Sequence, residues 1–507
     1  MIEKPSHTLA IIGGGISGLT AAYYAIEKGQ DPKSITIYEA GTRLGGRIQS
    51  LKLGERNINM GAEFIDSDHN ELIALCNRFG IALEPTQDQE NELFQLPNGK
   101  QMKSKDFHNQ FTPLRDLINL DREEMKINPK GATSKRLDNI SMQDYLTELL
   151  ERVQKERPRS WTQFLVDTAT FSDSRDKSEI IDMIKGAFSS ELGRPPSQIS
   201  AFQFINECSD QPDSLLSSDC GFRAQGGTER VIEELEKYLK EKGVEFKTSQ
   251  KLQSLEKHGD KISLELLGST EAHIVQTDQM VLALPTYALA SIKGLDKLGF
   301  SSDLLSSIME TQYTDNNMKL TVALKPGASV KKANMFSANG FQAWIPQDGV
   351  VTFLIARREG ENPKQAIERV TEQFAASYGK KADDLFMPRT TENLLFSAPT
   401  SKQSCYATPA PGQYTALKRV KSQMEQMPNN GVVITGTYLP IESGEGMGVG
   451  FMECGIKASQ RAVEKLMEHK KTRPVWLENT LENRPADVSH TASLVAPQEA
   501  AARGGIQ

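Results

Sequence analysis

Cysteine is scarce in this sequence, and its few occurrences form no recognisable pattern. Five cysteines are spread along 507 residues without a Cys-x-x-Cys pair: Cys76, Cys208, Cys220, Cys405 and Cys454. Disulfide frameworks and structural zinc sites need cysteines at close, regular spacings. The sequence therefore predicts neither a disulfide scaffold nor a metal site, and it favours a reducing compartment.

An excess of positive charge and long apolar runs are absent as well. Lys and Arg number 59 against 66 Asp and Glu, which gives a net charge of −7, and no dense basic stripe occurs. This balance argues against nucleic acid or an anionic membrane as a partner. The sequence contains no run of about 18 apolar residues, and residues 1–7 hold no apolar signal core. We therefore expect a cytoplasmic protein without a membrane anchor.

The overall composition is that of a folded protein with one unusual end. Hydrophobic residues make up 38% and charged residues 25% of the chain, which are ordinary globular values. A chain of 507 residues is too long for one hydrophobic core, so we expect several structural units. Residues 472–507 are rich in Ala, Pro, Glu, Asn and Ser and poor in aromatic residues, and this composition predicts a disordered tail.

Glycine, in contrast, is concentrated near the amino terminus. An apolar run over residues 8–12 leads into a turn containing Gly13, Gly15 and Gly18, after which the apolar spacing becomes helical. This is the dinucleotide fingerprint, in which the glycines make the turn, admit a pyrophosphate and let the helix pack on the strand. The helix amino terminus, which includes Ser17, would face phosphate. Because ligand-free turns also match such a pattern, the following residues decide its meaning.

Two further motifs support a bound dinucleotide. A second apolar strand ends at Glu39, 21 positions after the last glycine of the turn, where an acid would accept hydrogen bonds from ribose hydroxyls. A glycine pair that includes Gly46 then follows, bracketed by Arg43 and Arg47. This arrangement suits a second backbone approach to a pyrophosphate, with guanidinium charge beside it.

Together these motifs resemble those of the flavin-containing amine oxidase superfamily, whose bound dinucleotide is FAD. The resemblance covers nearly all of residues 8–470. It implies an α/β fold, with a Rossmann-like FAD-binding domain around a central parallel sheet and an interleaved α+β substrate-binding domain. The FAD-binding domain would comprise residues 1–87, 221–290 and 396–471, and the substrate-binding domain residues 88–220 and 291–395.

The resemblance also assigns FAD contacts to later segments of the chain. A helix that begins near Met452 would point its free N–H groups at the flavin's pyrimidine edge, and Leu252 would lie beside the adenine. The other residues implied in this way are Gly61, Ala62, Glu63, Gly436 and Thr437.

Three residues are implied as catalytic. Lys319 lies on a strand whose alternate apolar residues face the other way, and such a lysine is ordinarily solvated. The resemblance instead implies that it holds a water against flavin N5. It also implies that Tyr406 and Phe451 form the aromatic walls of the substrate site, with Phe451 standing where Tyr is usual. Glu63 and Asp66 could attract a cationic amine or merely cap and solvate a turn.

The function implied is oxidation of a small-molecule amine by O2. Hydride would pass from the amine's α carbon to flavin N5, the imine would hydrolyse, and the flavin would be reoxidised with formation of hydrogen peroxide. Alternatives remain open: a protoporphyrinogen-oxidase-like enzyme or desaturase, whose branch generally lacks the lysine; an L-amino-acid oxidase, which needs an arginine such as Arg78 or Arg223; or a non-catalytic FAD-bound interaction protein. Covalent attachment of the flavin through Cys405 is a further possibility.

Overall fold

The computed structural model describes most of the chain. The described residues are 8–86, 92–155, 174–311, 313–314, 316–331, 334–398, 406–426, 430–439 and 449–471. The expectations for Cys405 and for residues 472–507 therefore fall outside the described residues. Across these ranges, no helix is both long and apolar enough to cross a membrane.

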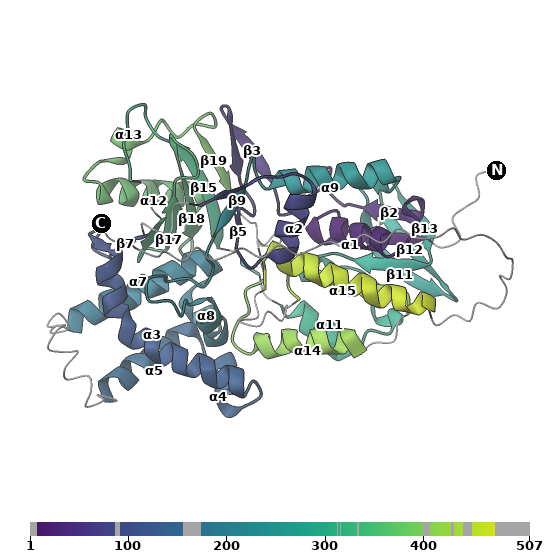
Figure 1. Cartoon of the computed structure of the whole chain (residues 1–507), viewed down its shortest axis with the longest axis horizontal. Helices are drawn as coiled ribbons and strands as arrows, with labels where there is room; N and C mark the ends of the chain where they lie inside the picture. Colours follow the sequence, from purple (N-terminus) through teal and green to yellow (C-terminus); the bar gives the residue numbers. More distant parts are fainter. Residues whose placement is uncertain are drawn as a thin grey trace, which may run out of the picture.

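A five-stranded sheet forms the centre of one lobe (Figure 1). Its order is β10 (Glu245–Lys247), β2 (Ile35–Tyr38), β1 (Leu9–Ile12), β14 (Gln279–Leu282) and β20 (Val432–Ile434). Every neighbouring pair is parallel. The apolar runs β1 and β14 and the edge strand β20 are buried along their whole length, as expected for strands covered on both faces. The predicted parallel sheet is confirmed.

Helices cover one face of this sheet and a smaller sheet covers the other. The helical layer consists of α1 (Ile16–Glu27), α9 (Glu229–Lys242) and α15 (Met452–Lys471), which share a core with Ile11 and Ile37. On the opposite face, Ile12 and Met280 pack against β11 (Lys251–His258), β12 (Lys261–Leu267) and β13 (Ala272–Thr277), together with α11 (Ser302–Met309).

The other lobe is built on a seven-stranded, largely antiparallel sheet. Its order is β19 (Leu394–Ser397), β15 (Asn317–Ala323), β18 (Val350–Ala356), β17 (Phe341–Trp344), β16 (Asn334–Ser337), β7 (Glu92–Gln95) and β8 (Gln101–Lys103). The helices α12 (Pro363–Ser377) and α13 (Ala382–Leu385) pack against it. This lobe is the predicted α+β unit.

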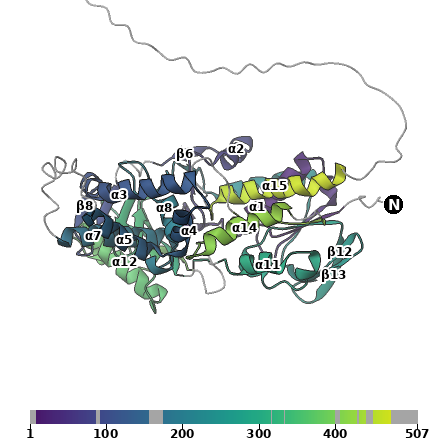
Figure 2. The same cartoon turned by 90° about the horizontal axis from the view of Figure 1, so that it is seen from below.

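A cluster of helices packs on the same lobe (Figure 2). It comprises α3 (Ser104–Ile127), α4 (Ala132–Asn139), α5 (Met142–Lys155), α7 (Ser174–Leu192) and α8 (Ala201–Glu207). Their core is rich in aromatic side chains such as Phe107, Phe188 and Phe204, and it also takes in Tyr414 at the start of α14 (Gln413–Gln426). The helix α14 therefore bridges this cluster and the core around α11, in which its Val420 is buried.

Short elements connect the lobes. They are β3 (Ser50–Leu53), β4 (Arg56–Asn59), β5 (Phe64–Ile65), α2 (Asn70–Arg78), β6 (Leu83–Pro85), β9 (Phe222–Ala224) and α10 (Thr286–Leu289). We propose that the FAD-binding domain extends past residue 290, since Leu304 and Ile308 of α11 are buried with Ile12 of β1. The predicted boundary between residues 395 and 396 divides β19 (Leu394–Ser397), which pairs with β15 of the second lobe, so we propose that it falls after this strand; the other boundaries stay predictions.

Candidate active site

The glycine turn between β1 and α1 has the shape that a dinucleotide requires. A Cβ added at Gly18 would lie 1.9 Å from the Gly13 carbonyl oxygen, and Gly13 itself has a φ of +109°. Glycine is therefore needed at both positions for steric reasons. At Gly15 an added Cβ would meet only the Gly45 carbonyl oxygen, at 4.0 Å. The space in front of Gly15, at the amino terminus of α1, fits an approaching pyrophosphate.

Glu39 lies at the end of β2 and faces this turn. Its Oε2 accepts a hydrogen bond from the Gly14 N–H at 2.8 Å, and its Oε1 accepts one from the Gly41 N–H at 2.7 Å. Each carboxylate oxygen has a second acceptor position. A held acid with remaining lone pairs fits the two hydroxyls of a ribose, as the sequence predicts.

The two arginines of the second glycine motif have different surroundings. Arg43 donates from its guanidinium to the carbonyl oxygens of Leu44, Gly46 and Ile48 and so holds its own loop in shape. Arg47 instead donates to Thr437 Oγ1 at 3.1 Å, which ties this loop to the segment after β20. The predicted residues Arg47 and Thr437 are thus brought together, whereas a direct cofactor contact by Arg43 stays a prediction.

Residues 61–62 lie directly against this arginine loop. A Cβ at Gly61 would be 1.9 Å from the Arg47 carbonyl oxygen, which also accepts from the Ala62 N–H at 3.3 Å. Gly61 is therefore another position at which a side chain would separate two segments of the site.

Glu63 is the centre of a buried charged cluster. Lys319 Nζ lies 2.6 Å from Glu63 Oε2 and also donates to the Gly61 carbonyl oxygen at 3.1 Å. Arg223 Nε lies 2.8 Å from Glu63 Oε1, and Trp344 Nε1 donates to the same oxygen at 3.0 Å. Lys319 Nζ also lies 5.4 Å from the centre of the Trp344 ring. The carboxylate thus joins two cations and an indole from three other parts of the chain.

Burial of this cluster is nearly complete. The side chains of Glu63 and Lys319 are 3% and 10% exposed, so the interpretations of Lys319 as a solvated lysine and of Glu63 as a solvated turn residue are wrong. Burial alone would raise the pKa of Glu63, but Lys319 and Arg223 together hold that pKa below its ordinary value. Glu63 is therefore ionised at neutral pH, and its charge is already compensated within the protein.

The two predicted aromatic walls lie close to each other. A Cβ at Gly450 would approach the Tyr406 Cβ to 3.3 Å, and Phe451 follows directly in the chain. The Tyr406 hydroxyl accepts from Asn317 Nδ2 at 2.8 Å and donates to the Glu191 carbonyl oxygen. Both rings are half-buried. The structure thus brings the backbone next to Phe451 close to Tyr406, while the contact of either ring with a substrate stays a prediction.

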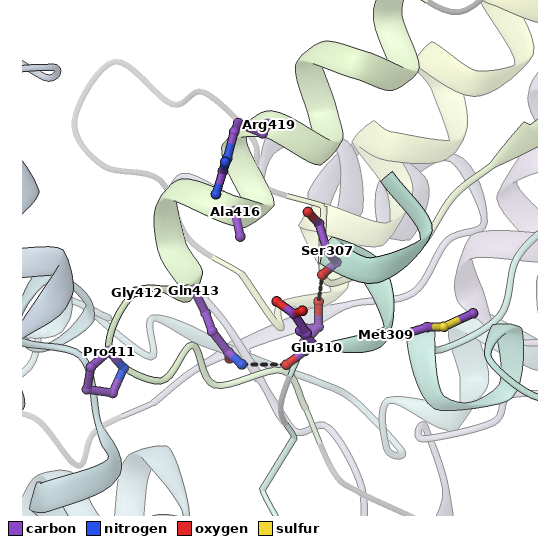
Figure 3. Close-up of a pocket in the computed structure, with 9 residues that line it drawn as sticks. Ser307, Met309, Glu310, Pro411, Gly412, Gln413, Ala416 and Arg419 are labelled. Carbon is purple, nitrogen blue, oxygen red and sulfur yellow. Dashed lines mark hydrogen bonds between the residues drawn. The ribbon is translucent and has the colours of Figure 1, made fainter. Parts of the chain in front are cut away.

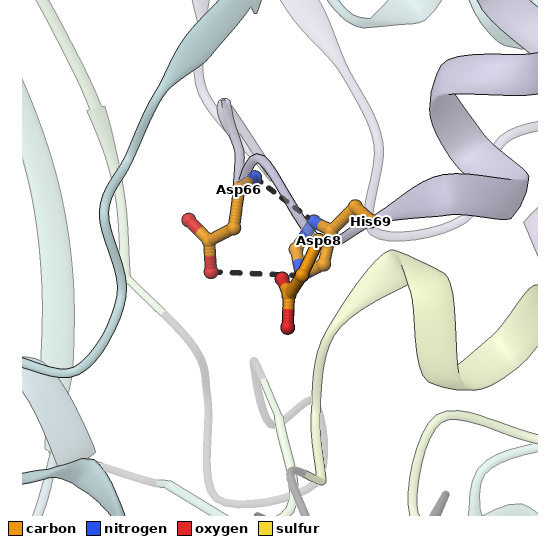
Figure 4. A group of neighbouring side chains, drawn as sticks. All are labelled: Asp66, Asp68 and His69. Carbon is orange, nitrogen blue, oxygen red and sulfur yellow. Dashed lines mark hydrogen bonds and ion pairs between the residues drawn. The ribbon is translucent and has the colours of Figure 1, made fainter. Parts of the chain in front are cut away.

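Phe451 also packs on a buried acid–histidine pair. This pair is Asp66 and His69, which Figure 4 shows together with Asp68. The His69 ring lies 5.5 Å from that of Phe451, and its Nε2 is 3.5 Å from Asp66 Oδ2. Ser218 Oγ and the Cys220 N–H both donate to Asp66 Oδ1. Asp66 is 8% exposed, so its interpretation as a solvated turn residue is wrong.

Asp66, Asp68 and His69 offer ligand atoms within 4.8 Å of one another, a spacing that a metal ion could use. His69 Nδ1, however, accepts a hydrogen bond from the Asp66 N–H, and Asp68 is exposed. Hydrogen bonds within the protein thus already occupy His69 Nδ1 and Asp66 Oδ1. The group is an acid–histidine pair with an exposed aspartate beside it.

The remaining predicted residues lie in the lobe of the parallel sheet. Leu252 is buried with Ile12 and Tyr38. Ser17 lies between α1 and α15, where a Cβ at Gly455 would be 2.6 Å from its Oγ. Met452 is the first residue of α15 and is buried in the core that it shares with α1. The first N–H groups of α15 lack intrahelical acceptors and begin beside Phe451.

A separate pocket of about 580 Å³ lies between α11 and α14 (Figure 3). It holds none of the predicted site residues. Its lining is Ser307, Met309, Glu310, Thr311, Pro411, Gly412, Gln413, Ala416 and Arg419.

Sequence reasoning missed several residues of the charged cluster and its surroundings. In the sequence Arg223 is an arginine outside any assignable motif, and Trp344, Asn317 and Glu191 carry no signal. Glu191, Asn317 and Trp344 each lie within a helix or strand with an ordinary apolar pattern. Only a search for polar side chains on buried strands could have drawn notice to Trp344 and Asn317.

Comparison with known proteins identifies relatives of this chain. A family profile described as flavin containing amine oxidoreductase matches residues 16–440. The chain is 28% identical over 96 residues to a probable flavin-containing monoamine oxidase A of Dictyostelium discoideum, which is 19% of this chain and 20% of that protein. It is 36% identical over 77 residues to a coproporphyrinogen III oxidase of Mycobacterium leprae, 15% of this chain and 17% of that protein. The chain thus matches only about a fifth of the length of these relatives.

A solved structure shares the fold over nearly the whole chain. Cyclohexylamine oxidase from Brevibacterium oxydans IH-35A superposes with a TM-score of 0.67 at 17% identity, covering 92% of this chain and 100% of that chain. At this identity the likeness shows a common fold.

Proposed function

The chain belongs to the flavin-containing amine oxidoreductase family and is an FAD-dependent oxidoreductase, and from this premise we propose that it oxidises small-molecule amines. In the overall reaction an amine, O2 and water give an aldehyde, hydrogen peroxide and ammonia or a smaller amine. Bound FAD supplies the two-electron chemistry. The cofactor would be held by the cradle around Gly15 and Glu39, whose open space and free acceptor positions fit its pyrophosphate and ribose.

The buried Lys319 is the observation that carries this proposal. Its ammonium group has three N–H donors, and two of them are used by Glu63 and the Gly61 carbonyl oxygen. The third has no acceptor among the described residues. We propose that it holds the water that hydrolyses the imine product, since an ammonium fixed at this point orients a water without moving.

The aromatic residues would orient the substrate. The hydrogen bonds from Asn317 and to Glu191 fix the plane of the Tyr406 ring, and His69 supports Phe451 from behind. Apolar rings in this position favour a neutral amine over its ammonium form. The two rings would also exclude water from the reacting carbon.

A spectroscopic experiment tests the proposal. The purified holoprotein is mixed anaerobically with a panel of aliphatic and aromatic monoamines, diamines and L-amino acids, and the flavin absorbance is followed. We expect at least one amine to bleach the flavin and, in air, to give hydrogen peroxide and an aldehyde. Reduction by a porphyrinogen and by no amine would contradict the proposal and favour the activity named for the Mycobacterium relative.

The variant Lys319→Met tests the role of the lysine. We expect bound FAD to be retained and turnover with the best amine to fall by about 10²-fold, the lower range for losing one positioned proton-transfer group. The measurement is the steady-state rate together with the ratio of FAD to protein. Unchanged turnover in a variant that still binds FAD would remove Lys319 from the mechanism. Lys325→Met is a matched control, because Lys325 lies on the same segment but is exposed.

A further inference from the structure

Trp344 is an uncharged residue that contacts the charged cluster at two points. It is the last residue of β17 and is 3% exposed. Its indole N–H donates to Glu63 Oε1 at 3.0 Å, and Arg223 Nε donates to the same oxygen at 2.8 Å. A carboxylate oxygen accepts about two hydrogen bonds, so these donors fill Oε1, and Lys319 binds Oε2 at 2.6 Å. The indole thus helps to decide which oxygen the lysine binds.

The face of the same ring lies near the lysine itself. Lys319 Nζ is 5.4 Å from the centre of the indole ring, within the range of about 6 Å in which an aromatic ring attracts a cation. The sheet register explains this proximity. On β18, Leu354 lies opposite Lys319 and Thr352 lies opposite Trp344. Since residues two apart on a strand share a face, Lys319 and Trp344 extend from the same side of the sheet.

The indole is held by an aromatic neighbour from the segment that carries the carboxylate. Phe64, which follows Glu63 in the chain, lies 5.3 Å from the Trp344 ring at a tilt of 58°. The guanidinium of Arg223 lies over Phe64, 4.7 Å from the centre of its ring. Trp344 therefore cannot turn without losing both its hydrogen bond to Glu63 and its packing on Phe64.

A buried indole usually has a partner for its N–H, and such a residue can serve packing alone. Trp344 differs because one contact is with the carboxylate that pairs with Lys319 and the other is with Lys319 itself. Without the indole, Glu63 Oε1 would have an unfilled lone pair that the ammonium group could bind in place of Oε2. The direction of the third N–H of Lys319 would then vary.

We propose that Trp344 is a positioning residue for Lys319, which fixes the direction of the ammonium N–H groups from two sides. This inference rests on the proposed amine oxidation, in which the third N–H of the lysine holds the hydrolytic water. Trp344 acts through the lysine and not through binding of the amine. Its loss therefore lowers kcat and kcat/KM by the same factor.

Two substitutions separate the contacts in the holoenzyme, assayed with the best amine of the anaerobic panel. Trp344→Phe keeps a ring beside the lysine but removes the N–H, and we expect kcat to fall by about twofold to tenfold, the factor that one hydrogen bond supplies. Trp344→Leu removes both contacts, and its kcat should approach that of Lys319→Met. Phe341→Leu is the matched control, because Phe341 lies on the opposite face of β17 in the sheet core and should keep nearly wild-type turnover. FAD content and thermal unfolding show whether each variant is folded.

A double-mutant cycle separates positioning from packing. In the background of Lys319→Met, Trp344→Phe should cause no further loss of turnover, because the residue through which it acts is gone. The cycle needs only Trp344→Phe, so it decides the question even if Trp344→Leu does not fold. If the two substitutions multiply their effects, or if both Trp344 variants turn over like the wild type, the inference is wrong and amine oxidation remains in place. If the wild-type enzyme oxidises no amine of the panel, the proposed function fails and the inference fails with it.

Discussion

At the scale of single residues, Glu63 links the segment around Gly61 to Lys319, the lysine proposed as catalytic. Its carboxylate accepts from Lys319, Arg223 and Trp344, and its neighbour Gly61 accepts from the same lysine. Arg223 also lies over the Phe64 ring, 4.7 Å from its centre. A lysine held by a fixed carboxylate and a fixed carbonyl has one available orientation. Glu63 is therefore the residue through which the two lobes set the position of the ammonium group.

The substitution Glu63→Gln should destabilise the protein in a pH-dependent way. Removing one member of a buried ion pair costs about 3–5 kcal/mol, so we expect a loss of this size in the free energy of unfolding at pH 7. The folded-state pKa of Glu63 lies below its ordinary value of 4.5. Its stabilisation is thus present above that value and is lost as the pH falls through the lower folded-state pKa.

Thermal or urea unfolding at pH 7 and at a pH below the lowered folded-state pKa of Glu63 measures this effect. The difference between wild type and variant should shrink at the lower pH, because both then lack the charge on residue 63. Glu256→Gln is the control, since Glu256 pairs with His258 on the surface and should change stability by less than about 0.5 kcal/mol. A difference that stays constant with pH would mean that Glu63 stabilises the fold without its charge.

At the scale of elements, the site depends on the contact between α1 and α15. Ser459 Oγ on α15 donates to the Ser17 carbonyl oxygen on α1 at 2.7 Å, and Gly455 has no room for a side chain against Ser17. The buried carboxylate of Glu453 then accepts from the N–H groups of Glu71 and Leu72 in the first turn of α2. The first turns of α15 therefore hold the amino-terminal ends of α1 and α2 in place around the proposed cofactor site.

Two glycine substitutions in the first turn should have different consequences. In Gly15→Ala the new methyl group meets no protein atom closer than 4.0 Å, so we expect the apoprotein to unfold at nearly the wild-type temperature. The same methyl would fill the space proposed for the pyrophosphate, and FAD affinity should fall at least about tenfold. In Gly18→Ala the clash with the Gly13 carbonyl oxygen should lower both stability and FAD content.

The flavin absorbance per protein and the thermal unfolding of the apoprotein distinguish the two variants. Normal FAD binding by Gly15→Ala would show that the cofactor does not pass in front of this residue. If Gly15→Ala lost as much stability as Gly18→Ala, its methyl group would be clashing with protein atoms. The space in front of Gly15 would then be smaller than the structure shows.

At the scale of the whole molecule, distant parts of the chain complete the parallel sheet. Its strands come from residues 9–12, 35–38, 245–247, 279–282 and 432–434, and α15 follows after the last of them. The chain leaves this sheet to form the antiparallel lobe and returns to it. Neither lobe is therefore a continuous segment, and both must form for the cradle to close.

A fragment that ends at residue 311 should fail to fold into the first lobe. It would contain β1, β2, β10 and β14 but would lack β20 and α15, so Val281 and much of the core around α1 would be exposed to water. We expect no cooperative thermal unfolding by circular dichroism and no uptake of FAD. A chain ending at residue 471 is the control, because it keeps every described element. A fragment that binds FAD would contradict this dependence on the returning strand.

The sequence by itself determined the first part of the cofactor cradle. The strand, the glycine turn, α1 and β2 with Glu39 lie within about forty consecutive residues, and their apolar spacing and glycine positions follow from local steric rules. The predicted strand over residues 35–38 and the helix beginning near Met452 appear as expected. The alternation around Lys319 was also correct, since Met318, Leu320 and Val322 are buried on one face.

Only the tertiary structure decided what surrounds Lys319. The partners of Glu63 lie 160, 256 and 281 positions away in the chain. Lys319 and Trp344 meet it only because β15 and β17 of the seven-stranded sheet face the segment that contains Glu63. The same holds for Glu191, Asn317 and Tyr406, which come from three separate segments. Local sequence fixes which way a side chain points from its strand or helix, but the burial and the partners that set its charge depend on how the lobes pack.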